Sequence, residues 1–171
     1  MSDLRFRAVE TDRLIVRPFV DTDAEARFAL MREAFGMDWP PERLARWHQW
    51  TLSSYESFGA MWQPPYGDYA VARKTTGELV GAVGIVPAVV PWAVLDRPTP
   101  ENTFVSPEFG LFWAMFRAHR GQGYATEGLR WLVGRCEDAG VSELWAAVHP
   151  DNLPAQRVRV VRADGGFVFD N

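Results

Sequence analysis

Cysteine is nearly absent from this chain. Cys136 is the one cysteine among 171 residues. A single thiol cannot close a disulfide within the chain, and it cannot build a cysteine-rich zinc site. Cys136 falls in RWLVGRCEDAG, a stretch with helical periodicity, so we expect a buried thiol and no cysteine nucleophile. The three histidines are scattered along the chain, and we expect no metal site.

Long apolar runs are also missing. No stretch approaches the length that a membrane-spanning helix needs, so we expect no membrane partner. The first residues, MSDLRFRAVETDR, carry scattered charge without an apolar segment, and we therefore expect no signal peptide. Together with the low cysteine content, these features predict a cytoplasmic protein.

The chain has no excess of positive charge. Its 18 Lys and Arg against 22 Asp and Glu give a net charge of −4, which argues against a nucleic-acid partner. The hydrophobic fraction of 47% and the charged fraction of 23% are ordinary for a globular protein. There are no repeats or low-complexity segments, so the length predicts a single domain over residues 1–171.

Strand and helix patterns alternate along the chain. Period-2 alternation predicts strands at 11–20, 68–74, 78–86, 103–116, 141–150 and 165–171. Caps and apolar stripes predict helices at 21–35, 41–58, 125–140 and 152–163. A proline-rich stretch at 87–102 is predicted to be an inserted loop. This order is typical of an α/β (α+β) domain, a mixed central sheet flanked by helices.

The most informative stretch is RAHRGQGYATEG, residues 117–128, where two glycines precede a helix-forming run. The start of a helix presents unpaired N–H groups and a positive dipole end, which is a site for phosphate. A P-loop would need a Lys followed by Ser or Thr, and neither stands after Gly123 in that register. A dinucleotide fingerprint would need a glycine where Thr126 stands. The pattern [QR]-x-x-G-x-[GA] matches Arg120 to Ala125 in full.

That last pattern resembles the pyrophosphate loop of the GNAT superfamily, the Gcn5-related N-acetyltransferases. HRGQGYATEGL is similar to the branch that acetylates the N-termini of ribosomal proteins. ETDRLIVRPFVDTDAEARFAL, GELVGAVGI, EFGLFW and VHPDN resemble further segments of the family, in the family's order. The resemblance extends from about Thr11 to Asn152.

The resemblance implies acetyl-CoA as the co-substrate. Loop amides would hold its pyrophosphate, and its pantetheine arm would pair with the strand before the loop. The residues expected to bind it are Phe112, Trp113, Ala114, Met115, Arg120, Gly121, Gln122, Gly123, Tyr124, Ala125, Thr126 and Asn152.

Acetyl transfer to a primary amine also needs a proton acceptor, because amines are mostly protonated at neutral pH. The resemblance places Glu108, on the strand entering the acetyl-CoA site, in the role of catalytic base. His119 is expected to shape the loop or meet the cofactor, and His149 is a second candidate for the base. Without a cysteine nucleophile, we expect direct attack in a ternary complex. The acceptor, a protein N-terminus or a small molecule, stays open.

The C-terminal region departs from the family pattern. Ala155 stands where the family commonly has a serine that protonates the departing thiolate, and no tyrosine follows Tyr124. The chain also ends early, with a shortened C-terminus that predicts an open sheet edge. We therefore expect a homodimer with Phe167 and Phe169 near the contact. These departures leave an alternative function open, a non-catalytic acyl-CoA-binding or regulatory module.

Overall fold

The computed structural model of the chain describes residues 8–61, 66–87, 109–138, 141, 144–146, 148, 151–156, 158–163 and 166–170. The proline-rich stretch beyond Pro87, the predicted base Glu108 and His149 lie outside the described residues.

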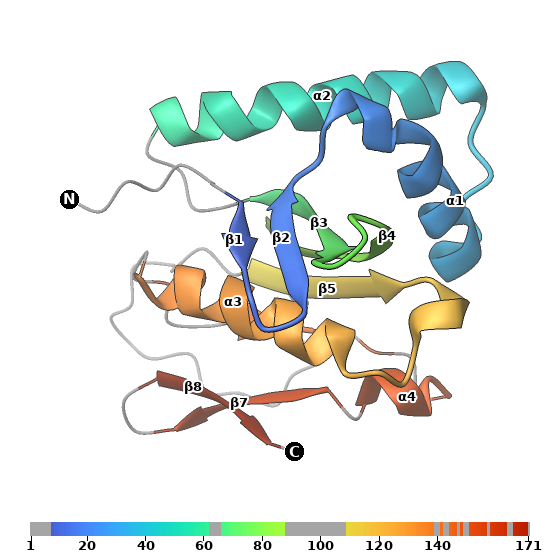
Figure 1. The fold of residues 1–171 in the computed structure, drawn as a ribbon. Coiled ribbons are helices and arrows are strands. Elements are labelled where there is room, and N and C mark those ends of the chain that lie inside the picture. Colours follow the sequence, from blue (N-terminus) through green and yellow to red (C-terminus); the bar gives the residue numbers. More distant parts are fainter. Residues whose placement is uncertain are drawn as a thin grey trace, which may run out of the picture.

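A six-stranded mixed sheet forms the centre of the protein (Figure 1). Its strands lie in chain order: β1 (Val9–Glu10), β2 (Leu14–Pro18), β3 (Gly67–Arg73), β4 (Leu79–Pro87), β5 (Phe109–Met115) and β6 (Leu144–Trp145). Neighbours from β1 to β5 are antiparallel, and β5 pairs with β6 in parallel. The predicted mixed α/β sheet is therefore confirmed.

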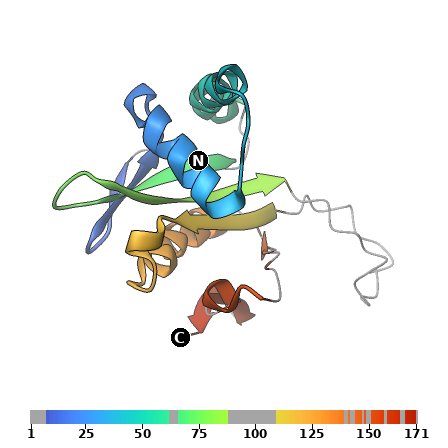
Figure 2. The same cartoon turned by 90° about the vertical axis from the view of Figure 1, so that its right-hand side faces the viewer.

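Helices cover both faces of this sheet. On one face lie α1 (Ala24–Phe35), which follows a 3-10 turn at Asp21–Asp23, and α2 (Pro41–Ala60). On the other face lies α3 (Tyr124–Asp138), as Figure 2 shows. Among the described residues, no helix is both long enough and apolar enough to span a membrane.

Strand alternation divides the apolar residues into two cores. Because successive side chains point to opposite faces, Val71 and Val83 pack toward α3, while Ala70 and Ala82 pack toward α1. The helix α3 approaches closely through Gly128, where a Cβ atom would lie 3.3 Å from the Val83 side chain. This packing fixes the N-terminal end of α3 against the sheet.

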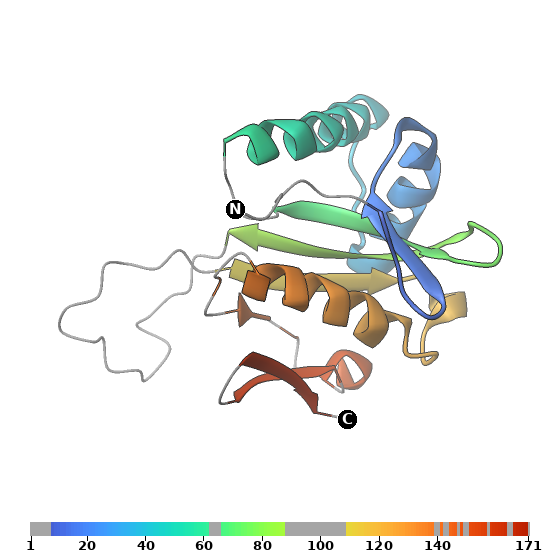
Figure 3. The same ribbon diagram turned by 60° about the vertical axis from the view of Figure 1, so that its left-hand side comes forward.

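The C-terminal region corrects one prediction. The helix predicted at 152–163 is wrong, because α4 spans only Leu153–Gln156 and is followed by a strand, β7 (Arg159–Ala163). This strand pairs antiparallel with β8 (Gly166–Asp170) in a separate two-stranded sheet beneath α3 (Figure 3). The β-branched run RVRVVRA favours a strand, and the Asp-Gly dipeptide after it is typical of a hairpin. The strand predicted at 165–171 is confirmed as β8.

Candidate functional site

The stretch from β5 to α3 forms a tight glycine turn, residues Arg120 to Gly123. A 3-10 turn at Arg117–His119 leads into it, and α3 begins directly after it. Gly121 and Gly123 have φ angles of 73° and 78°, in the left-handed region that other residues rarely adopt. Nothing lies within 4 Å of a Cβ atom built on Gly121, so the backbone conformation rather than crowding requires glycine there.

The turn leaves a run of backbone N–H groups available. Within the described part of the chain, the N–H groups of residues 121–126 have no hydrogen-bond acceptor. The first amide with a partner is that of Glu127, which donates to the Gly123 carbonyl at 3.0 Å. These six N–H groups lie at the positive end of the α3 dipole, so together they form a site for a phosphate group. We call them the phosphate seat.

One edge of β5 is open beside this seat. The strand pairs with β4 along its whole length but with β6 only at Phe109 and Gly110. Phe116 N–H donates to the Val80 carbonyl at 3.1 Å, so antiparallel alternation points the N–H and C=O groups of Trp113 away from β4. No described strand pairs with them on that side. An extended amide chain can therefore add to the sheet at Trp113.

The other residues predicted on β5 are buried or half-buried. Ala114 and Met115 are buried. The Phe112 ring packs over Gly84, where a Cβ atom would lie 2.0 Å from it. The Met115 carbonyl is occupied, because it accepts a hydrogen bond from Arg120 Nε at 3.0 Å. Contacts between these residues and a cofactor stay a prediction.

Two residues at the turn differ in exposure. The Arg120 side chain is 44% exposed, whereas the side chain of Tyr124, the first residue of α3, is buried. Asn152 is exposed, and its Oδ1 accepts the Ala155 N–H at 3.3 Å at the start of α4. Asn152 therefore caps this short helix, and its contact with a cofactor stays a prediction.

His119 Nδ1 accepts a hydrogen bond from Arg73 at 3.4 Å, and its Nε2 lies 3.3 Å from Glu78, so it joins the turn to the β3–β4 hairpin.

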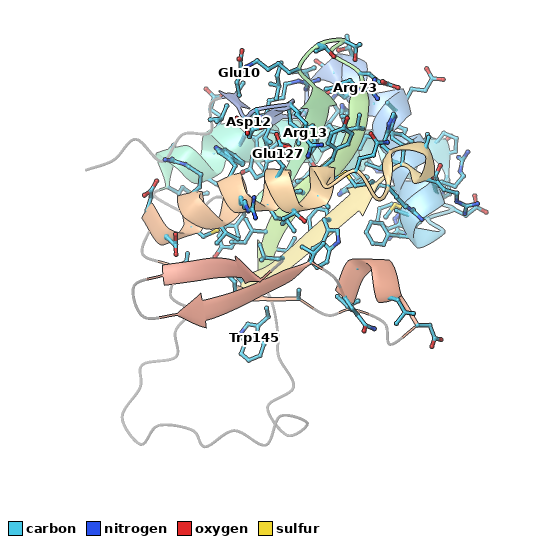
Figure 4. The ribbon with its side chains drawn as sticks, turned by 60° about the horizontal axis from the view of Figure 1, so that its bottom comes forward. Glu10, Asp12, Arg13, Arg73, Glu127 and Trp145 are labelled. Atoms are coloured by element: carbon cyan, nitrogen blue, oxygen red, sulfur yellow. The ribbon has the colours of Figure 1, made fainter. Side chains whose placement is uncertain are left out.

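Sequence reasoning missed the residues that support the turn from the N-terminal hairpin. Arg13 donates to Glu127, on α3, and to the carbonyl of Gln122. Figure 4 shows Arg13 and Glu127 close together between that hairpin and α3. On the opposite side, a Glu33 carboxylate oxygen of α1 accepts the N–H of Arg117. These partners lie far apart in the sequence, and no local pattern indicates such pairings.

An aromatic wall stands at the start of β5. The Tyr66 ring lies 5.7 Å from that of Phe58 and 5.3 Å from that of Phe109, measured between centroids. Burial raises the pKa of the Tyr66 hydroxyl, which is therefore neutral at physiological pH. The three rings come from α2, from the residue before β3 and from β5, so they join these elements at one end of the sheet.

The thiol of Cys136 is buried under α3, as predicted. Burial raises its pKa to about 12, so it is protonated at neutral pH and is a poor nucleophile. Among the described residues, no three His, Cys, Asp or Glu side chains gather in a way that could hold a metal ion.

Comparisons with known proteins agree with this geometry. A family model described as "Acetyltransferase (GNAT) domain" matches residues 13–159. The N-acetyltransferase YoaA of Bacillus subtilis (strain 168) is 29% identical over 160 residues, which cover 90% of this chain and 80% of YoaA.

Solved structures of acetyltransferases share the fold. A GNAT-family acetyltransferase from Bordetella pertussis superposes with a TM-score of 0.64 at 22% identity, covering 95% of this chain and 96% of that one. The ribosomal-protein-S5-alanine acetyltransferase from Vibrio fischeri gives 0.62 at 14% identity, covering 88% and 78%. The aminoglycoside N-acetyltransferase AAC(6')-Iy, solved in complex with CoA, gives 0.53 at 14% identity, covering 86% of each chain.

Proposed function

The chain belongs to the GNAT family of acetyltransferases, and from that premise we propose that it transfers the acetyl group of acetyl-CoA to a primary amine. The observation that carries this proposal is the phosphate seat, the N–H groups of residues 121–126 without acceptors among the described residues. A pyrophosphate is the anion that such a row of amides at a helix N-terminus suits.

Several groups fit the parts of acetyl-CoA. The amides of the phosphate seat would hold the pyrophosphate, and the exposed guanidinium of Arg120 would add a positive charge beside it. The free N–H and C=O groups of Trp113 would pair with the amides of the pantetheine arm. When bound, acetyl-CoA supplies an activated acetyl thioester.

The proton of the amine would pass to Glu108. In the sequence this residue directly precedes Phe109, the first residue of β5. The amine would attack while both substrates are bound, because the single cysteine is buried and protonated and cannot carry the acetyl group. With Ala155 in the family's serine position, the thiolate of CoA would leave without an acid, which its ordinary pKa of about 8.5 allows.

The acceptor and the assembly are further parts of the proposal. The similar proteins carry names that point to a ribosomal-protein alanine in one case and an aminoglycoside in another. Both names support a primary amine, and either a protein N-terminus or a small molecule fits. We propose a cytoplasmic homodimer with the C-terminal hairpin, near Phe167 and Phe169, at the contact between subunits.

Thermal unfolding with acetyl-CoA tests the cofactor site. Acetyl-CoA should raise the Tm of the wild type, because a ligand that binds only the native state stabilises it. Gly123→Val should remove this shift. Gly77→Val is the matched control, because Gly77 has a similar φ of 72°, lies in the β3–β4 turn and is uncrowded. Both substitutions carry a left-handed backbone cost of about 1–2 kcal/mol, but only the first changes the phosphate seat. An undiminished shift in Gly123→Val would contradict the site.

Release of free thiol from acetyl-CoA, with a panel of amines, tests the reaction itself. Glu108→Gln should lower kcat by roughly 10²-fold, the range of general base catalysis, and should leave the Kd for acetyl-CoA unchanged. Glu56→Gln, an exposed position on α2, is the control. Binding without turnover for any amine would favour the non-catalytic acyl-CoA-binding module instead.

A further inference from the structure

The carboxylate of Glu127 is held by the segment between β1 and β2. Arg13 Nε donates to Glu127 Oε2 at 2.7 Å, and Arg13 Nη2 lies 2.7 Å from the same oxygen. The other oxygen, Oε1, accepts from the Arg13 backbone N–H at 2.9 Å and from Thr11 Oγ1 at 2.5 Å. Four donors thus fix this carboxylate in one orientation, far more than a usual surface ion pair provides.

The same guanidinium also fixes the glycine turn. Arg13 Nη1 donates to the Gln122 carbonyl at 2.8 Å, and the guanidinium carbon lies 4.8 Å from the centre of the Tyr124 ring. In a planar trans peptide the C=O and the next N–H point in opposite directions. Anchoring the Gln122 carbonyl on Arg13 therefore directs the Gly123 N–H away from Arg13, into the phosphate seat. Three of the five N–H donors of the guanidinium contact the turn and Glu127, so Arg13 holds the turn through contacts that need no ligand.

Besides orienting the turn, Arg13 neutralises the negative charge of Glu127. Glu127 lies in the first turn of α3, and its side chain is only 17% exposed. Partial burial by itself raises the pKa of Glu127, but hydrogen bonds from Thr11 and Arg13 lower it, and the net shift is downward. The carboxylate is therefore ionised at neutral pH, at the end of the helix where an anion would bind. Without Arg13 its negative charge would repel that anion.

We propose that Thr11, Arg13 and Glu127 form a latch that sets the orientation of the phosphate seat, with Arg13 as a positioning residue for the pyrophosphate of CoA. This proposal rests on the proposed function. The latch holds the Gln122–Gly123 peptide in place and neutralises Glu127, so its loss weakens recognition of the pyrophosphate and leaves the pantetheine site on β5 intact.

Calorimetric titration of the purified chain with CoA, and with pantetheine, which lacks the pyrophosphate and nucleotide, tests the latch. Arg13→Ala should raise the Kd for CoA about tenfold, as loss of one charge-assisted contact would, and leave the Kd for pantetheine unchanged. Arg13→Lys keeps the positive charge but cannot contact Glu127 and Gln122 with several nitrogens at once, so it should raise the Kd for CoA by a smaller factor. It replaces Arg13→Ala in this test if that variant does not fold. Arg46→Ala, an exposed position on α2, is the control.

The double variant Arg13→Ala/Glu127→Gln separates the charge effect of the latch from its positioning effect. It should bind CoA more tightly than Arg13→Ala alone, because the uncompensated carboxylate is gone. A double variant that binds as weakly as the single one or weaker would overturn the charge effect of the latch, and equal losses for CoA and pantetheine would overturn the latch as a whole. If all variants bind CoA as the wild type does, the latch is overturned and the proposed function stands. If the wild type does not bind CoA, both proposals fail.

Discussion

Arg13 and Arg27 each join the N-terminal part of the chain to an acidic residue far along the sequence, but in opposite surroundings. The Arg27 side chain is fully buried, and its Nη2 lies 2.8 Å from Asp68 Oδ2. The Arg13 side chain is 49% exposed and pairs with Glu127 at 2.7 Å. The two pairs are almost equal in length, so the difference between them lies in their access to water.

The buried arginine sits at the junction of α1, α2 and β3. Besides Asp68, it donates to Thr51 Oγ1 at 3.0 Å and to His48 Nδ1 at 3.2 Å, and it packs 3.6 Å from the centre of a Trp47 ring. Burial, and then the nearby charge of Arg27, lowers the pKa of His48. A neutral His48 ring accepts this hydrogen bond and donates from Nε2 to a backbone carbonyl, which fixes its tautomer.

This contrast separates two uses of the same side chain. A charge without access to water depends entirely on its partners, so the Arg27 network holds helices to the sheet and its loss leaves other polar groups unpaired. An exposed pair contributes little to stability because water screens it. We therefore expect the contacts of Arg13 to affect the shape of the neighbouring glycine turn more than the stability of the fold. Such a residue is exposed because the phosphate seat that it shapes must be open to a ligand.

The largest expected effect is on stability at the buried network. Arg27→Ala should lower the free energy of unfolding by about 3–5 kcal/mol, the usual cost of removing one partner of a buried ion pair. Urea unfolding measures this loss, and Arg46→Ala, on the exposed face of α2, should stay within about 0.5 kcal/mol of the wild type. A loss below about 1 kcal/mol in Arg27→Ala would show that the network is not structural.

A third arginine pair, Arg17 and Asp23, is intermediate in burial between the other two, and its contribution to stability can be followed by changing the pH. The Asp23 carboxylate accepts from Arg17 Nη1 at 2.6 Å and from the Val20 N–H at 2.8 Å. Burial opposes ionisation, but these hydrogen bonds outweigh it, and the pKa of Asp23 is lowered from 3.8. Because the folded pKa is below the unfolded one, the stabilisation is present above the unfolded pKa and is lost as the pH falls through the folded pKa.

Asp23→Asn should therefore lower the free energy of unfolding at pH 7 by about 1–2 kcal/mol, the value of hydrogen bonds to a charged group discounted for partial exposure. It should also flatten the loss of stability below pH 4. Asp38→Asn, at an exposed position before α2, is the control. If the free energy of unfolding falls as steeply below pH 4 in Asp23→Asn as in the wild type, other carboxylates cause the acid sensitivity.

Arg13→Ala should change the free energy of unfolding by less than about 1 kcal/mol, because Glu127 keeps its hydrogen bonds from Thr11 and from the backbone N–H of residue 13, and removal of the half-exposed guanidinium admits water to it. Urea unfolding of this variant without ligand, beside Arg27→Ala, is the direct comparison. A loss in Arg13→Ala as large as that in Arg27→Ala would mean that both arginines stabilise the fold, and the contrast between them would fail.

Sequence patterns predicted the features that depend on neighbours in the chain. The strands at 68–74 and 78–86, the helix at 41–58 and the glycine turn follow from alternation, a proline start and glycine spacing, and the structure has each of them. The helix predicted at 152–163 failed because arginines alternating with valines suit a strand once a turn brings a partner alongside. Glu108, which the resemblance places as the base, lies outside the described residues.

The arginine networks could not be predicted in this way. Arg27, His48 and Thr51 are polar and so suggest an exposed surface, yet all three are buried. Only the fold brings Arg27 to Asp68, which provides the compensating charge. Likewise, Arg13 and Glu127 are 114 residues apart, and helical or strand periodicity carries no information over that separation.

The smallest effect expected is on the reactivity of Cys136 in Arg13→Ala. Burial keeps this thiol protonated, with its pKa raised to about 12, so a thiol reagent at pH 8 should label the native chain only through unfolding. Labelling should then accelerate by the factor by which each substitution raises the unfolded fraction. This factor is above about 100 for a loss of 3 kcal/mol in Arg27→Ala and at most about fivefold for 1 kcal/mol in Arg13→Ala. Fast labelling of the wild type, or equal labelling of both variants, would show that Cys136 is reached by local opening of α3 and not by unfolding of the core that Arg27 supports.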